Sequence, residues 1–264
     1  MQKISVVIWK EWLELLKQRM LLLSVLILPI TLSVIPLISL FGIALAPGTG
    51  EPDELTLRML ETDPTLIGLS EQAATQVIIG RSLSTLMLLL PMLIPSILAA
   101  YSIVGEKNNR TLEPILATPI TIWELLLGKI FATLIPSVLL TWFASMIFSV
   151  GVAQSAVDPI VFSLVVSPSW VLLLLLCAPL LSLIAISLMV MISSRTSDPR
   201  TAQQYSGVLV VPFLALFVSQ MFGILSFNPV TTLIATVIIA AFAALALWGA
   251  VMIFQRDSIL TRWN

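Results

Sequence analysis

The polar stretch at residues 105–129 carries the most informative spacing of chemical groups in the chain. Thr111 is suited to cap a short helix, and Pro114 falls in the first turn of that helix, where a proline is tolerated. Thr118 precedes Pro119, and this pair predicts that the helix ends after about seven residues. The spacing therefore predicts a short, stiff helix that stops at a sharp corner.

A second helix is expected to follow this corner directly. Thr121 can cap it, with Glu124 three positions on to complete a capping box. The sequence beyond Glu124 is apolar, so a short helix, a corner and a long helix stand in series. Such a rod can transmit force from a partner to the rest of the chain. An ordinary polar loop with capped helix ends is the alternative interpretation.

The residues needed for common enzymatic chemistry are missing from the sequence. The chain has no histidine, and its one cysteine, Cys177, lies in an apolar run. A histidine general base, a thiol–metal cluster and a disulfide framework within the chain are therefore not expected. The sequence contains no G-x-x-x-x-G-K-[ST] phosphate loop, and no carboxylate lies in the middle of an apolar stretch, where an ion-coupled carrier usually needs one. We expect a non-catalytic chain that holds no cofactor or metal of its own.

The elements that position these groups are long apolar segments. Of the 264 residues, 58% are hydrophobic and 10% are charged, a composition that fits a lipid environment. A membrane-spanning helix needs about 20 apolar residues. Segments of this length occur at 20–45, 77–104, 130–153, 170–192, 207–227 and 229–254. Asn228 and Pro229 mark a turn between the last two. The predicted fold is an all-α integral membrane protein with about six transmembrane helices.

An amphipathic helix is predicted before the first span, within residues 1–19. At 100° per residue its polar side chains gather on one arc: Lys3, Lys10, Glu11, Glu14, Lys17 and Gln18. Apolar residues, with Trp9 and Trp12 among them, fill the other side, and Val7 is an exception on the polar arc. This pattern is typical of a helix that lies in the membrane interface. A plain membrane anchor is the alternative, and one helix can do both jobs.

The basic residues predict the orientation in the membrane. If both termini are cytoplasmic, only Arg58 and Arg81 of the 13 lysines and arginines lie on the outer side. The outer loop at 46–76 is acidic, which fits a solvated cap or, alternatively, a vestibule that attracts cations. Asp63 and Pro64 predict the start of a short helix there. Arg81, near the outer end of the second span, is expected to reach towards the lipid headgroups.

Hydroxyl side chains form a stripe on the third span, each four residues from the next. They are Thr133, Ser137, Thr141, Ser145 and Ser149. Residues at this spacing share one helix face, so the stripe favours close helix packing, with a substrate-lining role as the alternative. Ser219 and Gln220 in the fifth span are further candidates for lining a substrate path, since a buried amide needs a partner.

The segment at 105–129 resembles the intracellular motif of type-2 permeases of ATP-binding-cassette (ABC) transporters. The residues that carry the resemblance are Glu106, the run Arg110-Thr111-Leu112-Glu113-Pro114-Ile115-Leu116-Ala117-Thr118-Pro119, and Gly128-Lys129. The motif covers about a tenth of the chain, and the predicted topology is similar over the whole length. Pro114 departs from the family pattern, in which many members carry an aliphatic residue, so the helix of the motif is expected to begin slightly later.

The resemblance implies a single permease domain over 1–264 whose coupling helix, at Thr111–Pro119, docks on a separate ATPase subunit. Glu106 and Arg110 would join a polar relay, with Thr111, Leu112, Glu113, Pro114, Leu116 and Pro119 in the docking helix. ATP and Mg²⁺ would be bound by the partner ATPase, and a second permease copy or homologue would complete a dimer.

Export across the plasma membrane, with the second and fifth spans lining the path, is also implied by the resemblance. Two other functions stay open on the sequence alone. One is a non-transporting scaffold or assembly factor, and the other is a channel or secondary carrier that works without an ATPase.

Overall fold

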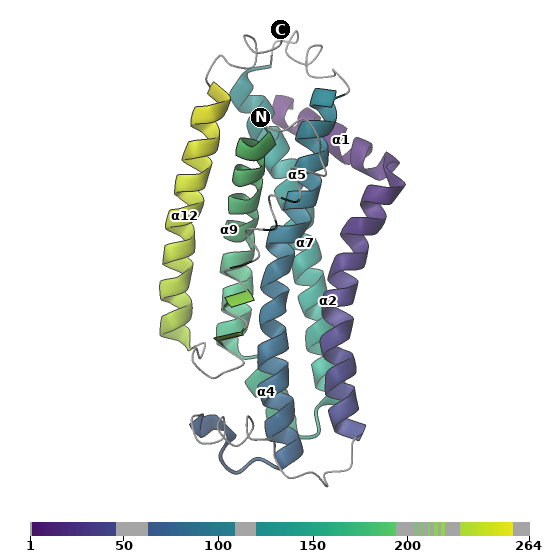
Figure 1. Cartoon of the computed structure of the whole chain (residues 1–264), viewed down its shortest axis with the longest axis vertical. Coiled ribbons are helices and arrows are strands. Elements are labelled where there is room, and N and C mark those ends of the chain that lie inside the picture. The colour runs from purple at the N-terminus through teal and green to yellow at the C-terminus, as the bar shows by residue number, and fades with distance from the viewer. Residues whose placement is uncertain are drawn as a thin grey trace.

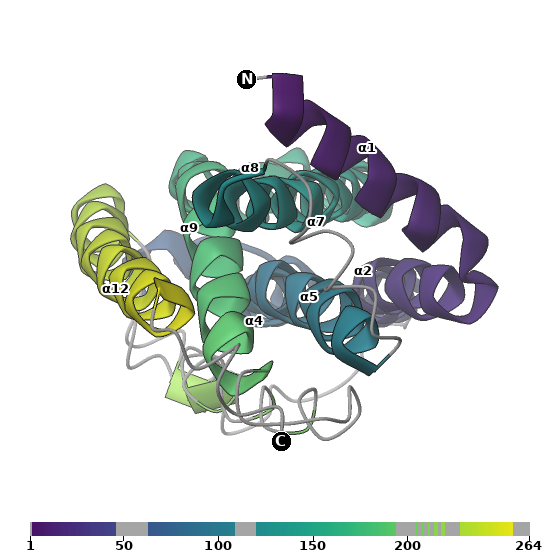
Figure 2. The same cartoon turned by 90° about the horizontal axis from the view of Figure 1, so that it is seen from above.

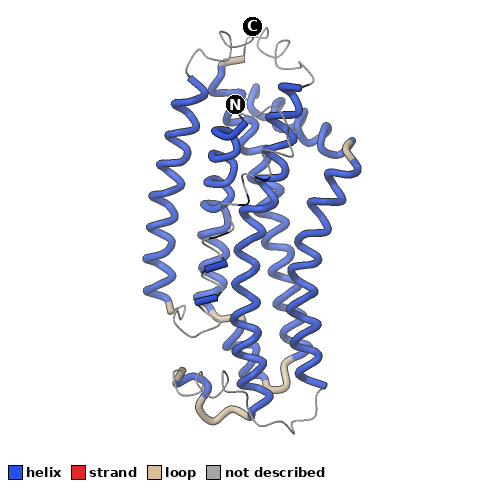
Figure 3. The backbone as a smooth tube through the Cα atoms, viewed as in Figure 1, coloured by secondary structure: helices blue, strands red, loops and turns tan. Residues whose placement is uncertain are grey.

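The computed structural model describes residues 2–45, 63–108, 120–193 and 228–255, together with isolated positions between 204 and 219. The described part of the chain is helical and contains no strand (Figures 1 and 3). The helices run side by side along the long axis of the molecule, except for the N-terminal helix, which crosses one end of the bundle. This arrangement confirms the all-α membrane fold predicted from the composition.

Five segments of the described residues are long and apolar enough to cross a membrane. The first is α2 (Arg19–Leu45), and the second is formed by α4 (Glu71–Thr85), the 3₁₀ turn η2 (Leu86–Leu89) and α5 (Leu90–Asn108) in succession. The other three contain α7 (Ile122–Ser155), α9 (Pro168–Ser193) and α12 (Pro229–Gln255). The sixth predicted span, at 207–227, lies outside the described residues apart from the isolated positions.

The second span changes from α-helix to 3₁₀ geometry and back in its middle, at η2. Pro91 and Pro95 follow this turn and lack the backbone N–H that a regular helix would use. Burial is densest here, because Met87, Leu90 and Ile94 are fully buried and belong to one hydrophobic core with residues of α2, α7 and α9. The second span therefore forms the centre of the bundle.

Helix α1 (Gln2–Lys17) lies across one end of the bundle, which we call the α1 end (Figures 1 and 2). It stops at Lys17, and α2 begins two residues later at Arg19 after a sharp change of direction. The predicted N-terminal amphipathic helix is therefore present. The C-terminal end of α5 and the start of α7 lie at the same end of the bundle. These two helix ends are the stems of the 105–129 segment, so α1 lies beside both stems.

The opposite end, the η1 end, carries two short helices. The 3₁₀ helix η1 (Pro64–Leu66) is capped by Asp63, whose side chain accepts a hydrogen bond from the Thr65 backbone N–H, as predicted. Helix α8 (Pro159–Val165) was not anticipated, although it begins in the same way with Asp158 as its cap and a proline at its first position. It packs against α4 and connects α7 to α9.

Candidate functional site

The two stems of the 105–129 segment are in place, and the tip between them lies outside the described residues. Glu106 lies near the end of α5, and the segment resumes at Ile120, just before α7. The other predicted coupling residues fall in the tip, outside the described part of the chain: Arg110, Thr111, Leu112, Glu113, Pro114, Leu116 and Pro119. Their predicted roles stay predictions.

Helix α7 begins with the predicted capping box. The Thr121 hydroxyl accepts a hydrogen bond from the Glu124 backbone N–H at 3.2 Å, and the Glu124 carboxylate accepts one from the Thr121 backbone N–H at 2.9 Å. The carboxylate also lies 3.8 Å from the Lys3 ammonium group on α1. The start of α7 is therefore fixed in direction and already touches α1.

Gly128 allows α1 to approach α7 closely. A Cβ atom at position 128 would lie 2.6 Å from Cγ1 and 2.7 Å from Cβ of Val7, closer than side-chain carbons can come. Val7 is 5% exposed, which explains why an apolar residue occupies the polar arc of α1. The arc does not face water along its whole length, because part of it is the face that packs on α7.

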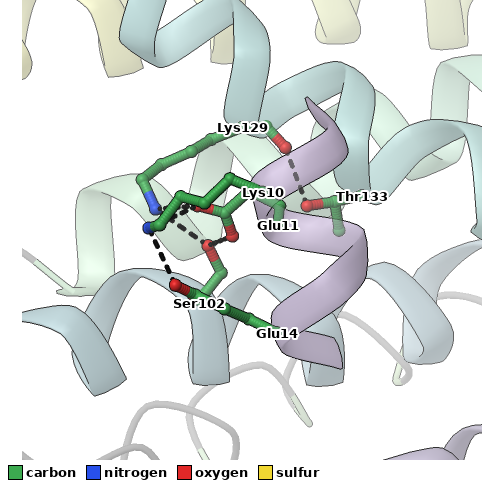
Figure 4. A network of polar contacts seen from close by, with 6 residues as sticks. All are labelled: Lys10, Glu11, Glu14, Ser102, Lys129 and Thr133. Atoms are coloured by element: carbon green, nitrogen blue, oxygen red, sulfur yellow. Dashed lines mark hydrogen bonds and ion pairs between the residues drawn. The ribbon is translucent and has the colours of Figure 1, made fainter. Parts of the chain in front are cut away.

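A buried ion pair lies beside this contact, four residues along α1 from Val7 (Figure 4). The Lys129 ammonium group donates to Oε1 of Glu11 at 2.8 Å and to the Ser102 hydroxyl at 3.0 Å. The Ser102 hydroxyl donates in turn to Oε2 of Glu11 at 2.6 Å. We call these three residues the α1–α5–α7 clasp, after the helices that supply them. Glu11 is only 3% exposed, although the sequence placed it on a polar arc.

The clasp keeps the Glu11 carboxylate ionised. Burial on its own would raise the pKa of Glu11, but the charge of Lys129 and the hydrogen bonds from Lys129 and Ser102 outweigh that effect. Lys10, whose ammonium group is 3.6 Å from Glu11 Oε1, adds to the same effect. The pKa of Glu11 is therefore below its ordinary value, and its carboxylate stays charged at neutral pH.

One further contact holds α1 in register on α7. The indole N–H of Trp12 donates to the backbone carbonyl of Ala132 at 2.9 Å. Together with the Lys3–Glu124 pair and the clasp, this bond fixes α1 along the first three turns of α7. Within α1 itself, Lys10 pairs with Glu14 at 3.3 Å (Figure 4).

The hydroxyl stripe continues along α7 from the clasp towards the η1 end. Each hydroxyl donates to the carbonyl four residues earlier, at 2.7–2.8 Å, starting with Thr133 to Lys129 and continuing through Ser137, Thr141, Ser145 and Ser149. Thr133, Ser137 and Thr141 are all buried. Their donors are satisfied within the helix, which fits the packing interpretation, and the substrate-lining alternative stays untested.

Of the two candidates from the fifth span, the structure describes only Ser219, and no hydrogen bond of the described residues joins it to this stripe. Ser219 is one of the isolated positions, and its hydroxyl donates to the carbonyl of Ala215 at 2.7 Å. Gln220 lies outside the described residues. Their proposed place in a substrate path therefore stays a prediction.

A second polar cluster joins helices at the η1 end. The Gln76 side chain is fully buried and donates to the carbonyls of Leu40 at 3.1 Å and Ser155 at 2.8 Å. Its oxygen accepts from the Val157 backbone N–H at 3.0 Å. The ends of α2 and α7 are thereby tied to α4.

Arg81 lies one turn further along α4 and has specific partners at the η1 end. It donates to the Leu164 carbonyl at 3.0 Å and to Asp63 Oδ2 at 2.6 Å, so it does not simply extend towards lipid headgroups as expected. Burial alone would raise the pKa of Asp63, but hydrogen bonds from Thr65 and the charge of Arg81 lower it below its ordinary value. These contacts fix η1 against α4 and α8.

Sequence reasoning placed Lys129 in the motif and missed its partners. Glu11 was assigned to the water-facing side of α1, and Ser102 was treated as part of an apolar span. One signal was available, because Val7 interrupts the polar arc four residues before Glu11 and so marks a buried strip on that face.

Comparison with known proteins agrees with this architecture. A profile of the family described as "ABC-2 family transporter protein" matches residues 5–232, which include most of α1, the clasp and the hydroxyl stripe. A search of curated proteins found no match. Because the profile covers most of the chain, and because the fold is a multi-pass helical bundle with the expected motif stems, this chain belongs to the ABC-2 family of transporter proteins.

Proposed function

We propose that this chain is the permease subunit of an ABC exporter, and that a separate ATPase subunit binds ATP and Mg²⁺ and drives it. The permease carries out no catalysis and forms the substrate path together with a second permease copy or homologue. The segment at 105–129 is the coupling segment that docks on the ATPase, through Glu113 and Leu116 among others.

The observation that carries this proposal is the position of the clasp. Ser102 is on α5 just before the segment, and Lys129 is the last residue of the segment on α7, so Glu11 joins the two stems on either side of it. A force applied to the tip of the segment cannot displace the α5 stem or the α7 stem alone, because the clasp transmits the force to the other stem and to α1. The segment therefore rests on a stiff base, which a force-transmitting device needs and a plain surface loop does not.

The route of the force follows from the helices. Helix α7 runs without interruption from the capping box at Thr121 to Ser155 at the opposite end of the bundle. A displacement at its start is passed along a single rod, and through α1 it also reaches the beginning of α2. ATP binding in the partner would move the coupling segment, and the spans near the dimer axis would switch the path from inward-open to outward-open.

Orientation and direction rest on the sequence pattern. The bias of basic residues supports a cytoplasmic α1 end and cytoplasmic termini in the plasma membrane. Export, and a path lined by the second and fifth spans, are supported by the resemblance of the coupling segment to the type-2 permease motif. Thr133, Ser137, Thr141, Ser219 and Gln220 are the residues proposed to border that path.

The test is a comparison of ATPase binding among variants of the coupling segment. The chain is expressed in its native host with an affinity tag, and proteins recovered with it are identified and quantified. We expect an ABC ATPase in a fixed ratio to the permease. Glu113→Arg and Leu116→Pro should abolish recovery, whereas Glu54→Arg, a matched charge reversal in the 46–76 loop, should leave it unchanged.

Three outcomes would contradict the proposal. Recovery of the ATPase that survives both coupling variants would show that the segment is not its docking site. Transport by the purified chain alone in vesicles would favour the channel or carrier alternative. An ATPase that binds and hydrolyses ATP without any substrate movement, over a broad panel of compounds, would favour the scaffold alternative.

A further inference from the structure

Helix α1 has a second face that the contacts with α7 do not use. Val7 and Glu11 point into the bundle, whereas four large apolar side chains on the other side stay exposed. They are Val6 at 64%, Trp9 at 62%, Leu13 at 42% and Leu16 at 64%. Their spacing of three and four residues puts them in one stripe along the helix. Helix α1 turns directly into α2 (Figures 1 and 2), so the stripe runs towards the start of the first span.

The stripe ends at the turn between α1 and α2, where two cations are exposed. Lys17 is the last residue of α1 and Arg19 is the first of α2, and both side chains lie at the surface. Met20, the next residue, is 83% exposed and continues the apolar stripe onto α2. We call Leu13, Leu16, Lys17, Arg19 and Met20 the elbow surface.

The cations of the elbow surface differ from the other basic residues of α1. Lys3 is paired with Glu124, and Lys10 is paired with Glu11 and Glu14. Among the residues that the structure describes, no carboxylate lies within ion-pair distance of Lys17 or Arg19. Two positive charges therefore stand together at the point where the first span begins.

We propose that the elbow surface binds an anionic glycerophospholipid, with the headgroup phosphate between Lys17 and Arg19 and the acyl chains along Leu13, Leu16 and Met20. Charge complementarity selects the occupant: an arginine guanidinium and a lysine ammonium group suit a phosphate, and basic residues beside a span attract anionic lipids. The apolar stripe favours a lipid over a soluble anion, because a free phosphate would leave the apolar side chains of the stripe uncovered. The first candidate span of the structure begins at Arg19, which places the pair at headgroup depth.

The elbow surface is held in position by the contacts described above. Val7 against Gly128 and Glu11 against Lys129 fix α1 on α7, so Lys17 is presented at a defined place relative to Arg19. This lipid site does not depend on the ATPase. Its test can therefore succeed or fail separately from the coupling proposal.

The experiment measures lipid binding to the purified full-length chain in detergent, by native mass spectrometry. Phosphatidylglycerol and phosphatidylcholine are titrated separately, and the ratio of their apparent dissociation constants is recorded. We expect the wild-type chain to prefer phosphatidylglycerol. Lys17→Gln and Arg19→Gln should each weaken phosphatidylglycerol binding about five-fold and leave phosphatidylcholine binding unchanged, so that the preference disappears in the double variant.

Matched variants separate a local site from general attraction. Lys3→Gln makes the same charge change at the other end of α1 and should leave the lipid preference intact. Leu16→Asn should weaken binding of both lipids equally, because it acts on the acyl-chain contact. Glycerol 3-phosphate, which has the charge without the chains, should not displace phosphatidylglycerol.

Three results would overturn the proposal. Equal losses in Lys3→Gln and Lys17→Gln would mean that net charge, not the elbow surface, determines the preference. An unchanged preference in the Lys17→Gln/Arg19→Gln double variant would place the lipid elsewhere. Displacement by glycerol 3-phosphate would identify a site for a soluble anion instead of a lipid.

Discussion

The ammonium group of Lys129 lies 2.8 Å from Oε1 of Glu11, although the two residues are 118 positions apart in the chain. The contact joins α1 to α7 beside the stem of the coupling segment, and Ser102 brings α5 into the same group. A buried pair of this kind is sensitive to the loss of either partner. The charge that remains is buried, so water cannot hydrate it in place of the lost partner. Its energetics can therefore be measured by mutation.

Loss of one partner of the clasp is expected to release α1. Lys129→Met leaves the Glu11 carboxylate buried without its cation, and should cost about 3–5 kcal/mol of the free energy that holds α1 in place. The measurement is hydrogen–deuterium exchange of the α1 backbone amides in detergent micelles. Lys10→Met, which removes a more exposed charge, should change that free energy by less than about 1 kcal/mol.

The double variant Glu11→Leu/Lys129→Met is expected to exchange more slowly than either Glu11→Leu or Lys129→Met alone. Both charges are then gone, and neither is left buried without its partner. Strictly additive losses in this cycle would show that the two residues do not stabilise α1 through each other.

Acid is expected to loosen α1 in a defined range. The pKa of Glu11 is lower in the folded chain than its ordinary value, so its contribution to stability is complete above the ordinary glutamate pKa. That contribution is lost as the pH falls through the lowered value. Amide exchange of α1, corrected for its intrinsic pH dependence, should rise in this acidic range for the wild-type chain. Glu11→Gln should exchange faster at neutral pH and lose most of this acid response.

Gly128→Ala is expected to push α1 away from α7. The new Cβ would overlap both Cβ and Cγ1 of Val7, and we expect a cost of about 1–3 kcal/mol. Gly42→Ala is the control, because a Cβ at that helical position would have no neighbouring atom of the described residues within 4 Å. It should be neutral or stabilise the chain by up to about 1 kcal/mol. Equal apparent melting temperatures for the two variants would argue against the close packing of α1 on α7.

Gln76→Leu is expected to weaken the η1 end. It leaves the Val157 N–H and the carbonyls of Leu40 and Ser155 without their side-chain partner, at about 1–3 kcal/mol for each group left buried and unsatisfied. Thr75→Val is the matched control, since the Thr75 hydroxyl donates only to the carbonyl of Glu71 in its own helix. Thermal unfolding in detergent should separate the two variants clearly. A Gln76→Leu chain as stable as Thr75→Val would mean that the amide does not hold these helix ends together.

Substitutions at Ser137 distinguish packing from other roles of the hydroxyl stripe. Its side chain is fully buried, and its hydroxyl donates to the Thr133 carbonyl, a bond within the helix that contributes little to net stability. Ser137→Ala should therefore change the apparent stability by less than about 1 kcal/mol, whereas Ser137→Leu should cost about 1–3 kcal/mol through overpacking. A well-folded Ser137→Leu chain would indicate that space is available beside α7, as a substrate path requires.

Local features were predictable from the sequence because neighbouring residues determine them. The capping box of Thr121 and Glu124, the Asp63 cap and the existence of α1 depend on residues within one or two helical turns. Apolar length predicted α2, α7, α9 and α12 to within a few residues at most of their ends, except that α7 begins at Ile122, eight residues before the expected span. That extension follows from the capping box, which had been assigned to the same helix.

Contacts between distant residues were not predictable in the same way. The partners of Glu11 and Gln76 are set by the packing of whole helices, and a single sequence does not show which helices meet. The polar arc of α1 was misleading because helical periodicity shows which residues share a face, and not whether that face meets water or another helix. The contact between Val7 and Gly128 shows that part of the polar arc meets another helix, and it is seen only when α1 and α7 are considered together.

The length of α7 has a consequence for the two polar clusters at its ends. Lys129 and Ser155 are both on this helix, and the α-helical rise places them about 39 Å apart, more than the roughly 30 Å of the hydrocarbon layer. A helix without strong tilt cannot bury both positions in the acyl chains at once. At least one of the two clusters, the charged group around Glu11 or the amide group around Gln76, therefore lies at or beyond a margin of the hydrocarbon layer. There, water and headgroups lower the electrostatic penalty that ionised and polar side chains would incur at mid-depth.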